Sequence, residues 1–263
     1  MPNKDKSMIH FSGNTDSCTK DAILNIFGFQ DCDHKSKHLG LSFCKAKSKK
    51  VACSDTFDKL NSSLNGWKAK LLSQASKTVL INSIALALPS YSMSTIIFPK
   101  DFCYKMDGMI RKFWWGSNSN GNSLMLKCWD AICAPKSSGG LGFRRMADLN
   151  KALLSKLAWD ISTQKDTTWI KLLTTKYLRG KLFLKDDISH HNVSRIWTDI
   201  YSCRDIIKKG AIFNVKTNSD LLIWSDPWIP TIPGFTPQTS SISNTLPVNL
   251  LKDLIDQRSA TWN

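Results

Sequence analysis

Apolar residues recur at the spacing of one helix face in two long stretches of the sequence, and this pattern constrains the fold most. The first stretch runs from about 48 to 115, and its first helix face holds Phe57, Leu60, Leu64 and Trp67. The second holds a helix at 146–163, followed by a shorter one at 167–178. On one side of the 146–163 helix lie Leu149, Leu153, Leu157, Ala158 and Ile161. The sequence therefore predicts a mainly α protein of the α+β class, built on a helical bundle.

Capping and breaking residues set the expected ends of these helices. Ser73 caps a helix that runs to Leu88 and stops at Pro89. Pro99 suits the first turn of the next helix, which ends at Trp115. Near the N-terminus, Thr19 caps a short helix at 19–29 and Gly28 stops it.

Short strands are expected at both ends of the chain. Alternating apolar residues indicate strands at 7–12 and 39–43, and again within 211–217 and 220–230. The tail from 231 to 249 is rich in Pro, Ser and Thr and has little to pack. The predicted organisation is a β-containing segment at 1–47, helical regions at 48–120 and 121–210, a short β segment at 211–235 and a flexible tail at 236–263.

The charge of the chain favours a polyanionic partner. Lys and Arg number 36 against 21 acids, which gives a net charge of +15. Nucleic acid is the commonest partner of so basic a protein, and an anionic membrane is the second. All the acids are Asp, so any mechanism that needs a glutamate as base, acid or metal ligand is excluded.

The densest positive patch lies between Asp33 and Asp55, where no acid occurs. A footprint that is read mainly through phosphates needs lysine and arginine without neighbouring carboxylates. The residues predicted to contact nucleic acid are Lys35, Lys37, Lys45, Lys47, Lys49 and Lys50 from this patch, with Lys68, Lys70, Lys77, Arg111 and Lys112 from the helices.

The eight cysteines show no repeating spacing, and the first residues have no apolar leader segment. Reduced thiols and an intracellular location are therefore expected, without a choice between nucleus and cytoplasm. Cys32, His34, His38 and Cys44 are all zinc-ligand types, but their spacing matches no common structural site. We expect neither a metal nor a cofactor. Residues 79–99 carry no charge, yet Pro89 interrupts them, so a buried helix followed by an extended segment is expected rather than a membrane span.

Other motifs do not form a convincing active site. Asp186 and Asp187 are the sole acidic doublet, and the lysine before them and the polar run after them favour a solvated turn over a magnesium site. The glycines of "GGLGF" (139–143) favour a sharp turn before the 146–163 helix over a phosphate cradle. Of the adjacent Trp114 and Trp115, the first is expected in the core. The second is expected to cover another helix of the chain rather than to offer a stacking platform.

Five segments in this order resemble a known family. They are "HKSKHLGLSF", "LNGWKAKLLSQASKTVLINSIALALPSYSMSTIIFPK", "IRKFWWG", "CWDAICAPKSSGGLGFRRMADLNKALLSKLAWDI" and "LIWSDPWIP". Together they resemble the region downstream of the catalytic palm in reverse transcriptases of plant LINE-type (non-LTR) retrotransposons. The resemblance runs from about residue 3 to about 235.

The resemblance implies a layout and a function. Residues 1–47 would be a palm remnant with primer-grip-like strands, 48–120 the thumb and 121–210 a connecting region. In full-length elements this region leads to a zinc-binding segment and often to a ribonuclease H domain. The family's aromatic-x-Asp-Asp motif is absent from this sequence, so we expect no RNA-directed DNA polymerase activity from this chain alone.

Three functions remain open at this point. The chain is expected to be a truncated, catalytically inactive retroelement fragment that binds RNA or DNA weakly and without sequence specificity. The alternative is a translated relic with no selected biochemical role. A third hypothesis is an enzyme that acts with a palm supplied by another chain. No small-molecule substrate and no membrane partner are expected.

Overall fold

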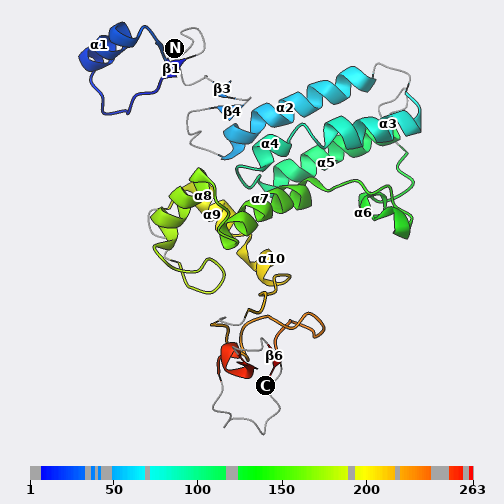
Figure 1. Ribbon diagram of the computed structural model, residues 1–263. Helices are drawn as coiled ribbons and strands as arrows, with labels where there is room; N and C mark the ends of the chain where they lie inside the picture. The colour runs from blue at the N-terminus through cyan, green and yellow to red at the C-terminus, as the bar shows by residue number, and fades with distance from the viewer. Residues whose placement is uncertain are drawn as a thin grey trace. The chain divides into compact units, whose positions relative to one another are not determined.

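The protein is mainly α-helical, as the sequence predicts (Figure 1). A computed structural model describes residues 7–32, 37–38, 41–42, 49–68, 72–116, 124–188, 193–216, 220–237, 249–256 and 261–262. By its contacts the chain divides into two compact units, Met1–Asn150 and Lys151–Asn263. The division falls inside one helix, α7 (Met146–Ser162). The domain boundaries expected at 47, 120, 210 and 235 stay predictions.

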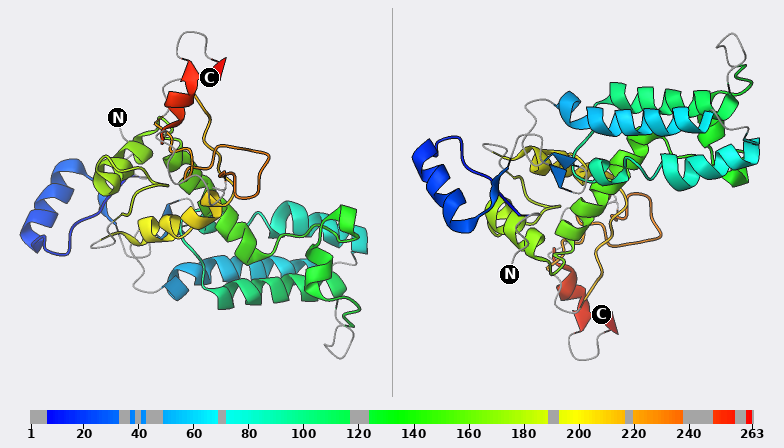
Figure 2. Two further views of the ribbon diagram at one scale, coloured as in Figure 1. Left: turned by 90° about the horizontal axis from the view of Figure 1, so that it is seen from below. Right: turned by 90° about the horizontal axis from the view of Figure 1, so that it is seen from above.

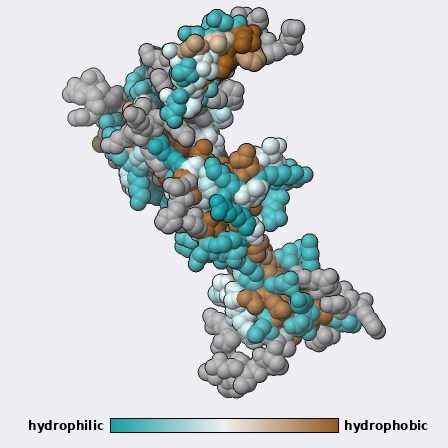
Figure 3. Space-filling model, turned by 90° about the vertical axis from the view of Figure 1, so that its left-hand side faces the viewer, coloured by the Kyte–Doolittle hydropathy of each residue, from teal (hydrophilic) through white to brown (hydrophobic). Residues whose placement is uncertain are grey.

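The first unit begins with a short β–α–β segment. Strand β1 (Met8–Ile9) pairs in parallel with β2 (Gln30–Asp31), and α1 (Ser17–Phe27) connects them. The N-cap of α1 is Asp16, whose carboxylate accepts the Thr19 N–H, so the predicted cap at Thr19 was wrong by three residues. Gly28 ends the helix at φ 64°, as predicted. Helix α1 buries no residue, and Ile26 is 77% exposed, which leaves the apolar surface near the top of Figure 3.

A helical bundle forms the core of the first unit (Figure 1, Figure 2). Helix α2 (Lys49–Lys68) lies along α5 (Lys100–Trp115). The Phe57 and Phe102 ring centroids are 5.9 Å apart, and those of Trp67 and Phe113 are 5.8 Å apart, so the two helices run parallel. Between them lie the fully buried side chains of Leu60, Leu64, Met106, Ile110 and Phe113. Each such side chain contributes roughly 1.5–3 kcal/mol by leaving water. A hairpin of β3 (Lys37–His38) and β4 (Leu41–Ser42) precedes the bundle.

The uncharged stretch from 79 to 99 folds differently from the prediction. Ser73 does cap α3 (Gln74–Leu80), but this α-helix gives way to a π-helical turn, η2 (Ile81–Ala85). Pro89 then precedes another helical turn, α4 (Ser90–Met93), where an extended segment was expected. Proline is tolerated there because the first residues of a helix need no N–H partner. Within the described residues, no helix is both long and apolar enough to cross a bilayer.

Two polar side chains fix the start of α7 in the first unit. Asn150 is 1% exposed; its amide donates to the carbonyls of Met93 (2.6 Å) and Ile96 (2.9 Å), and its Oδ1 accepts the Phe98 N–H (2.7 Å). Asp107 on α5 accepts the Met146 N–H at 3.1 Å, and so caps α7 from another helix. Sequence spacing alone predicts neither bond.

Asp107 makes the stability of the first unit depend on pH. Burial raises the pKa of the Asp107 carboxyl to about 6, while the bond from the Met146 N–H acts to lower it. The folded chain therefore holds this proton more tightly than the unfolded chain, and stability falls as pH rises from about 4 to about 6. At pH 7.5 we expect Asp107→Asn to raise the free energy of unfolding by about 2 kcal/mol, because the amide keeps the acceptor without the buried charge.

Urea unfolding of the two proteins at pH 4.5 and 7.5 checks this. The difference between Asp107→Asn and the parent should be large at pH 7.5 and small at pH 4.5. Asp101→Asn controls for the loss of one carboxylate from the same helix, since Asp101 is exposed. Equal differences at both pH values would contradict the account.

The remaining helices of the first unit are short, and those of the second follow α7. Leu149, Ala158 and Ile161 of the predicted α7 face are buried, as expected. Leu153 and Leu157 are half-buried, and Leu154, which was not predicted, is buried as well. Between α5 and α7 lie α6 (Trp129–Cys133) and the 3-10 turn η3 (Lys136–Ser138). After α7 come α8 (Thr168–Leu173), the π-helical turn η4 (Thr174–Leu178), α9 (Arg195–Tyr201) and α10 (Arg204–Lys208).

The strands expected within 211–230 do not form. Leu222 makes one isolated bridge with Leu250, and the other described residues of 211–230 form no strand. Leu221 and Ile223 pack instead on Leu251, which is 0% exposed. The C-terminal strands lie further along, at β5 (Ile255–Asp256) and β6 (Thr261–Trp262), after the 3-10 turn η5 (Leu251–Leu254). The segment 249–256 was assigned to the tail, but Leu251 and Leu254 within it pack with Leu221 and Ile223.

Candidate nucleic-acid interface

The C-terminal end of α5 meets α3 at a place where the sequence carries no acid. Residues 59–100 and 108–129 contain no Asp or Glu. The Trp114 indole N–H donates to Thr78 Oγ1 at 3.0 Å and holds the two stretches together. Because α2 runs parallel to α5, its last turn ends beside Phe113 at the same end of the bundle. We call this region, defined by Lys77, Arg111 and Lys112, the basic end of the bundle.

The three cations of the basic end differ in their surroundings. Lys112 is exposed and has no ion-pair partner among the described residues. The Lys77 ammonium lies close to Gly116, the C-cap of α5, where it faces the negative end of the helix dipole. Arg111 is half-buried, and its Nε has no hydrogen-bond partner within the described structure. The basic end therefore retains positive charge that no carboxylate of the described residues is seen to neutralise.

The side-chain positions of the other eight predicted contact residues are not described. Lys35, Lys45, Lys47 and Lys70 lie outside the described residues. The backbones of Lys37, Lys49, Lys50 and Lys68 belong to described elements, but the positions of their side chains are not described. Of the predicted set, the structure places Lys77, Arg111 and Lys112 on the two helices that meet here, and all eleven residues stay predictions as nucleic-acid contacts.

Trp114 and Trp115 have structural contacts. Trp114 packs edge-on to Phe143, with ring centroids 6.4 Å apart, in addition to its bond to Thr78. Trp115 lies edge-on to Trp114 at 4.7 Å, and its indole nitrogen is buried without a hydrogen-bond partner in the described structure. Both side chains are half-buried, so Trp114 lies at the edge of the core rather than inside it. The described ring contact of Trp115 is with Trp114 on the same helix, so the expected cover of another helix stays a prediction.

The turn formed by "GGLGF" has the geometry that its glycines predict. Gly139 and Gly142 have φ values of 77° and 71°, which favour glycine. A Cβ on Gly140 would lie 2.0 Å from the Ala134 carbonyl oxygen. The segment is a sharp turn before α7.

The acidic doublet also forms a turn. The Asp186 carboxylate accepts the Leu182 N–H at 2.6 Å, and the Asp187 carbonyl accepts the Lys181 ammonium at 2.7 Å. His34 and Cys44 of the candidate zinc ligands lie outside the described residues. Within the described part of the chain, no three His, Cys or Asp side chains come together in a way that could hold a metal ion.

Comparison with known proteins places the chain among plant proteins. No protein-family model matches it. It is 30% identical over 145 residues to the "Uncharacterized mitochondrial protein AtMg00310" of Arabidopsis thaliana, and the match covers 55% of this chain and 94% of that protein. The chain belongs to the family of AtMg00310.

A second relative connects the AtMg00310 family to a longer protein. The chain is 31% identical over 187 residues to the "Putative ribonuclease H protein At1g65750" of Arabidopsis thaliana. That match covers 68% of this chain but 30% of the relative, so the chain spans less than a third of the longer protein. Together, the two relatives support a retroelement-derived plant protein.

Proposed function

We propose that the chain is a fragment of a retrotransposon RNA-directed DNA polymerase that retains weak, non-specific binding to nucleic acid. The thumb-like assignment of residues 48–120 is part of this proposal. The named ribonuclease H relative supports it, because the resemblance places this region upstream of a ribonuclease H domain in full-length elements. The helical bundle of α2, α3 and α5 is compatible with it.

The basic end of the bundle is the observation that carries the binding proposal. Lys77, Arg111 and Lys112 come from two stretches without any acid, and the Trp114–Thr78 bond joins the two helices that carry them. Such an arrangement favours binding to phosphate groups, because each phosphate that a lysine or arginine neutralises releases a counterion, whatever the base sequence. Binding by this surface should therefore be sequence-independent.

Filter binding to a duplex at low salt tests the proposed interface. We expect Lys112→Gln to weaken binding about two- to five-fold, because one phosphate contact is lost. Lys105→Gln is the matched control: it removes the same charge from the same helix, but Lys105 is at the other end and pairs with Asp101 at 3.0 Å. Equal losses in the two variants would mean that net charge alone acts, and no duplex binding at low salt would refute the proposal.

We also propose that the chain has no polymerase activity of its own. The resemblance places the catalytic aspartates outside this sequence, and the Asp186–Asp187 doublet is committed to a turn. Primer extension with the purified chain, Mg²⁺ and deoxynucleotides should yield no product. Extension by the chain alone would contradict the proposal, and extension only after a palm-containing chain is added would favour an enzyme assembled from two chains.

A further inference from the structure

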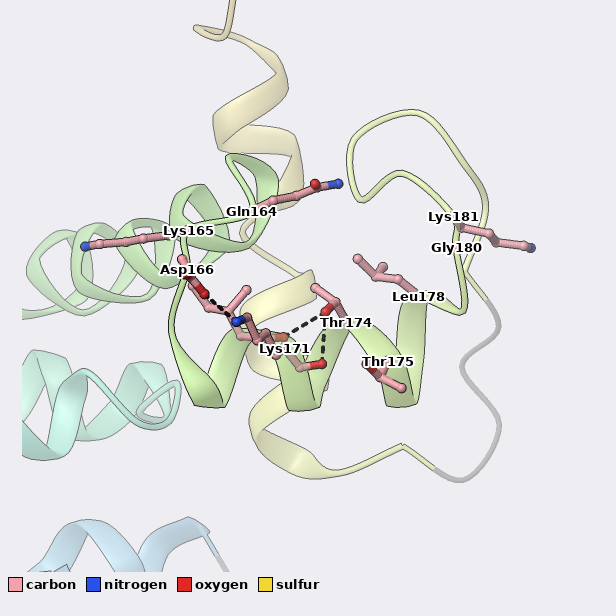
Figure 4. A pocket seen from close by; sticks show the side chains of 10 residues that line it. Gln164, Lys165, Asp166, Lys171, Thr174, Thr175, Leu178, Gly180 and Lys181 are labelled. Atoms are coloured by element: carbon pink, nitrogen blue, oxygen red, sulfur yellow. Dashed lines mark hydrogen bonds and ion pairs between the residues drawn. The ribbon is translucent and has the colours of Figure 1, made fainter.

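The pocket of the second unit in Figure 4 has several polar side chains that already bond to neighbouring residues. Lys171 pairs with Asp166 at 2.6 Å, and the Thr174 hydroxyl donates to the Lys171 carbonyl at 3.0 Å. The Lys181 side chain extends away from the pocket, and its ammonium donates to the Asp187 carbonyl at 2.7 Å. These groups are therefore not available to a ligand, in contrast to an exposed aromatic surface at the C-terminal end of the same unit.

Two stacked tryptophans, Trp228 and Trp262, form this surface, which we call the aromatic pair. Their ring centroids are 5.9 Å apart, and the angle between the ring planes is 29°. The Trp228 indole N–H donates to the Ile223 carbonyl at 2.9 Å, and Trp228 packs on the buried cluster around Leu251, so its ring is held in place. Trp262 on β6 pairs in register with Ile255 and is 57% exposed, so more than half of its surface is open to a ligand.

The surroundings of the aromatic pair are acidic, although the chain as a whole is basic. Residues 217–263 contain four Asp against two cations, whereas the net charge of the chain is +15. Lys252, one of the two cations, pairs with Asp220 at 2.7 Å. Asp253 is exposed, forms no ion pair among the described residues, and lies two residues before β5, the strand that pairs with β6. A ligand at the aromatic pair therefore meets net negative charge, which favours a cation.

This charge separates the ligands that an exposed tryptophan can take. A nucleobase can stack on such a ring, but every nucleotide of a strand also brings a phosphate, which the carboxylates repel. An arginine guanidinium is planar, stacks on the face of an aromatic ring and attracts carboxylates, so it uses both features of the surface. A purely apolar partner would use the ring alone.

We propose that the aromatic pair binds an arginine-bearing peptide segment of a partner protein. The guanidinium lies on the exposed ring of Trp262, and Asp253 supplies charge of the opposite sign. The site belongs to the second unit and does not use the basic end of the bundle, so either proposal can fail without the other.

Fluorescence anisotropy of a labelled peptide of Arg–Gly repeats, titrated with the intact chain, tests this proposal. A salt concentration of about 0.15 M is appropriate, because screening over about 8 Å then suppresses the repulsion from the other cations of the chain, while a direct contact persists. We expect the arginine peptide to bind at least about two-fold more tightly than a Lys–Gly peptide of the same length and charge, because an ammonium cannot stack as a planar guanidinium does. Equal affinities would mean that charge alone acts and would overturn the proposal, as would no binding of the arginine peptide at millimolar concentration.

Three variants localise the binding. Trp262→Leu should weaken the arginine peptide about two- to five-fold, which is the size of an exposed cation–π contact. Asp253→Asn should weaken it about two-fold, and because Asp253 is exposed this change should leave the fold intact. Trp159→Leu, which removes a 46% exposed tryptophan of the same unit, should change nothing.

Circular dichroism shows whether each variant is folded, and unchanged peptide affinity in folded Trp262→Leu and Asp253→Asn would place the peptide elsewhere and refute the site. A single-stranded hexamer of deoxyadenosine covers the other ligand class. If Trp262→Leu weakens binding of the hexamer and not of the peptide, the surface is a base-stacking platform and the proposal is wrong.

Discussion

Replacing Gly140 with alanine is expected to lower the free energy of unfolding by about 3 kcal/mol or more, the largest effect expected at any of the described glycines. A Cβ at this position would lie 2.0 Å from the Ala134 oxygen and 2.5 Å from its carbonyl carbon. Both are backbone atoms, so no side chain can rotate to make room. The turn also carries the bonds from Leu141 N–H to the Ile132 carbonyl and from Gly142 N–H to the Ala134 carbonyl, which would have to move.

Gly108→Ala is the matched control for this substitution. Gly108 is inside α5, and a Cβ there would meet nothing within 4 Å. The same change should stabilise the protein by about 0.5–1 kcal/mol, because alanine favours a helix interior over glycine. Chemical denaturation of both variants gives the two values. Similar stabilities for Gly140→Ala and the parent would show that the turn is not as tight as described.

Asn150→Ala is expected to destabilise the first unit by about 3 kcal/mol, because it removes three hydrogen bonds and leaves buried partners without replacements. The Met93 carbonyl is at the end of α4, and the Phe98 N–H lies in the segment between α4 and α5. Asn150 connects both of them to α7 by hydrogen bonds. Asn150→Asp should be nearly as harmful, since a carboxylate cannot donate to the two carbonyls.

Asn82→Ala provides the comparison, because Asn82 is exposed on η2 and should change stability by less than about 0.5 kcal/mol. Hydrogen exchange adds a local readout: in Asn150→Ala the Phe98 amide should lose protection before the amides in the middle of α5 do. Retained protection at Phe98 would contradict the role assigned to Asn150.

The helices that the sequence predicts well are those whose signals are local. The apolar face of α5 repeats over 16 residues, and Pro99 marks its start, so its bounds agree with the prediction within one residue. Ser73 caps α3 as expected because the capping bond spans only three residues. Where a competing residue is near, as with Asp16 and Thr19, pattern alone did not choose the right cap.

The features that the sequence did not predict depend on distant partners. The π-helical turns η2 and η4 each add one residue to a hydrogen-bonded turn, which apolar spacing does not show. The strand-like pattern near Leu221 and Ile223 failed because an alternating segment forms a strand only beside a partner strand, and here its partner is a loop with Leu251. The interface was predicted from charge alone, and the Thr78–Trp114 bond that assembles its described part joins residues 36 positions apart.

The salt dependence of duplex binding tests the central claim most directly. The logarithm of the association constant should fall linearly with the logarithm of the salt concentration for the intact chain. For the double variant Arg111→Gln/Lys112→Gln, the slope should be shallower by about two, one for each lost phosphate contact, while Lys105→Gln keeps the slope of the parent. A slope that the double variant leaves unchanged, or an intact chain that binds no duplex at low salt, would contradict the assignment of the basic end as a nucleic-acid interface.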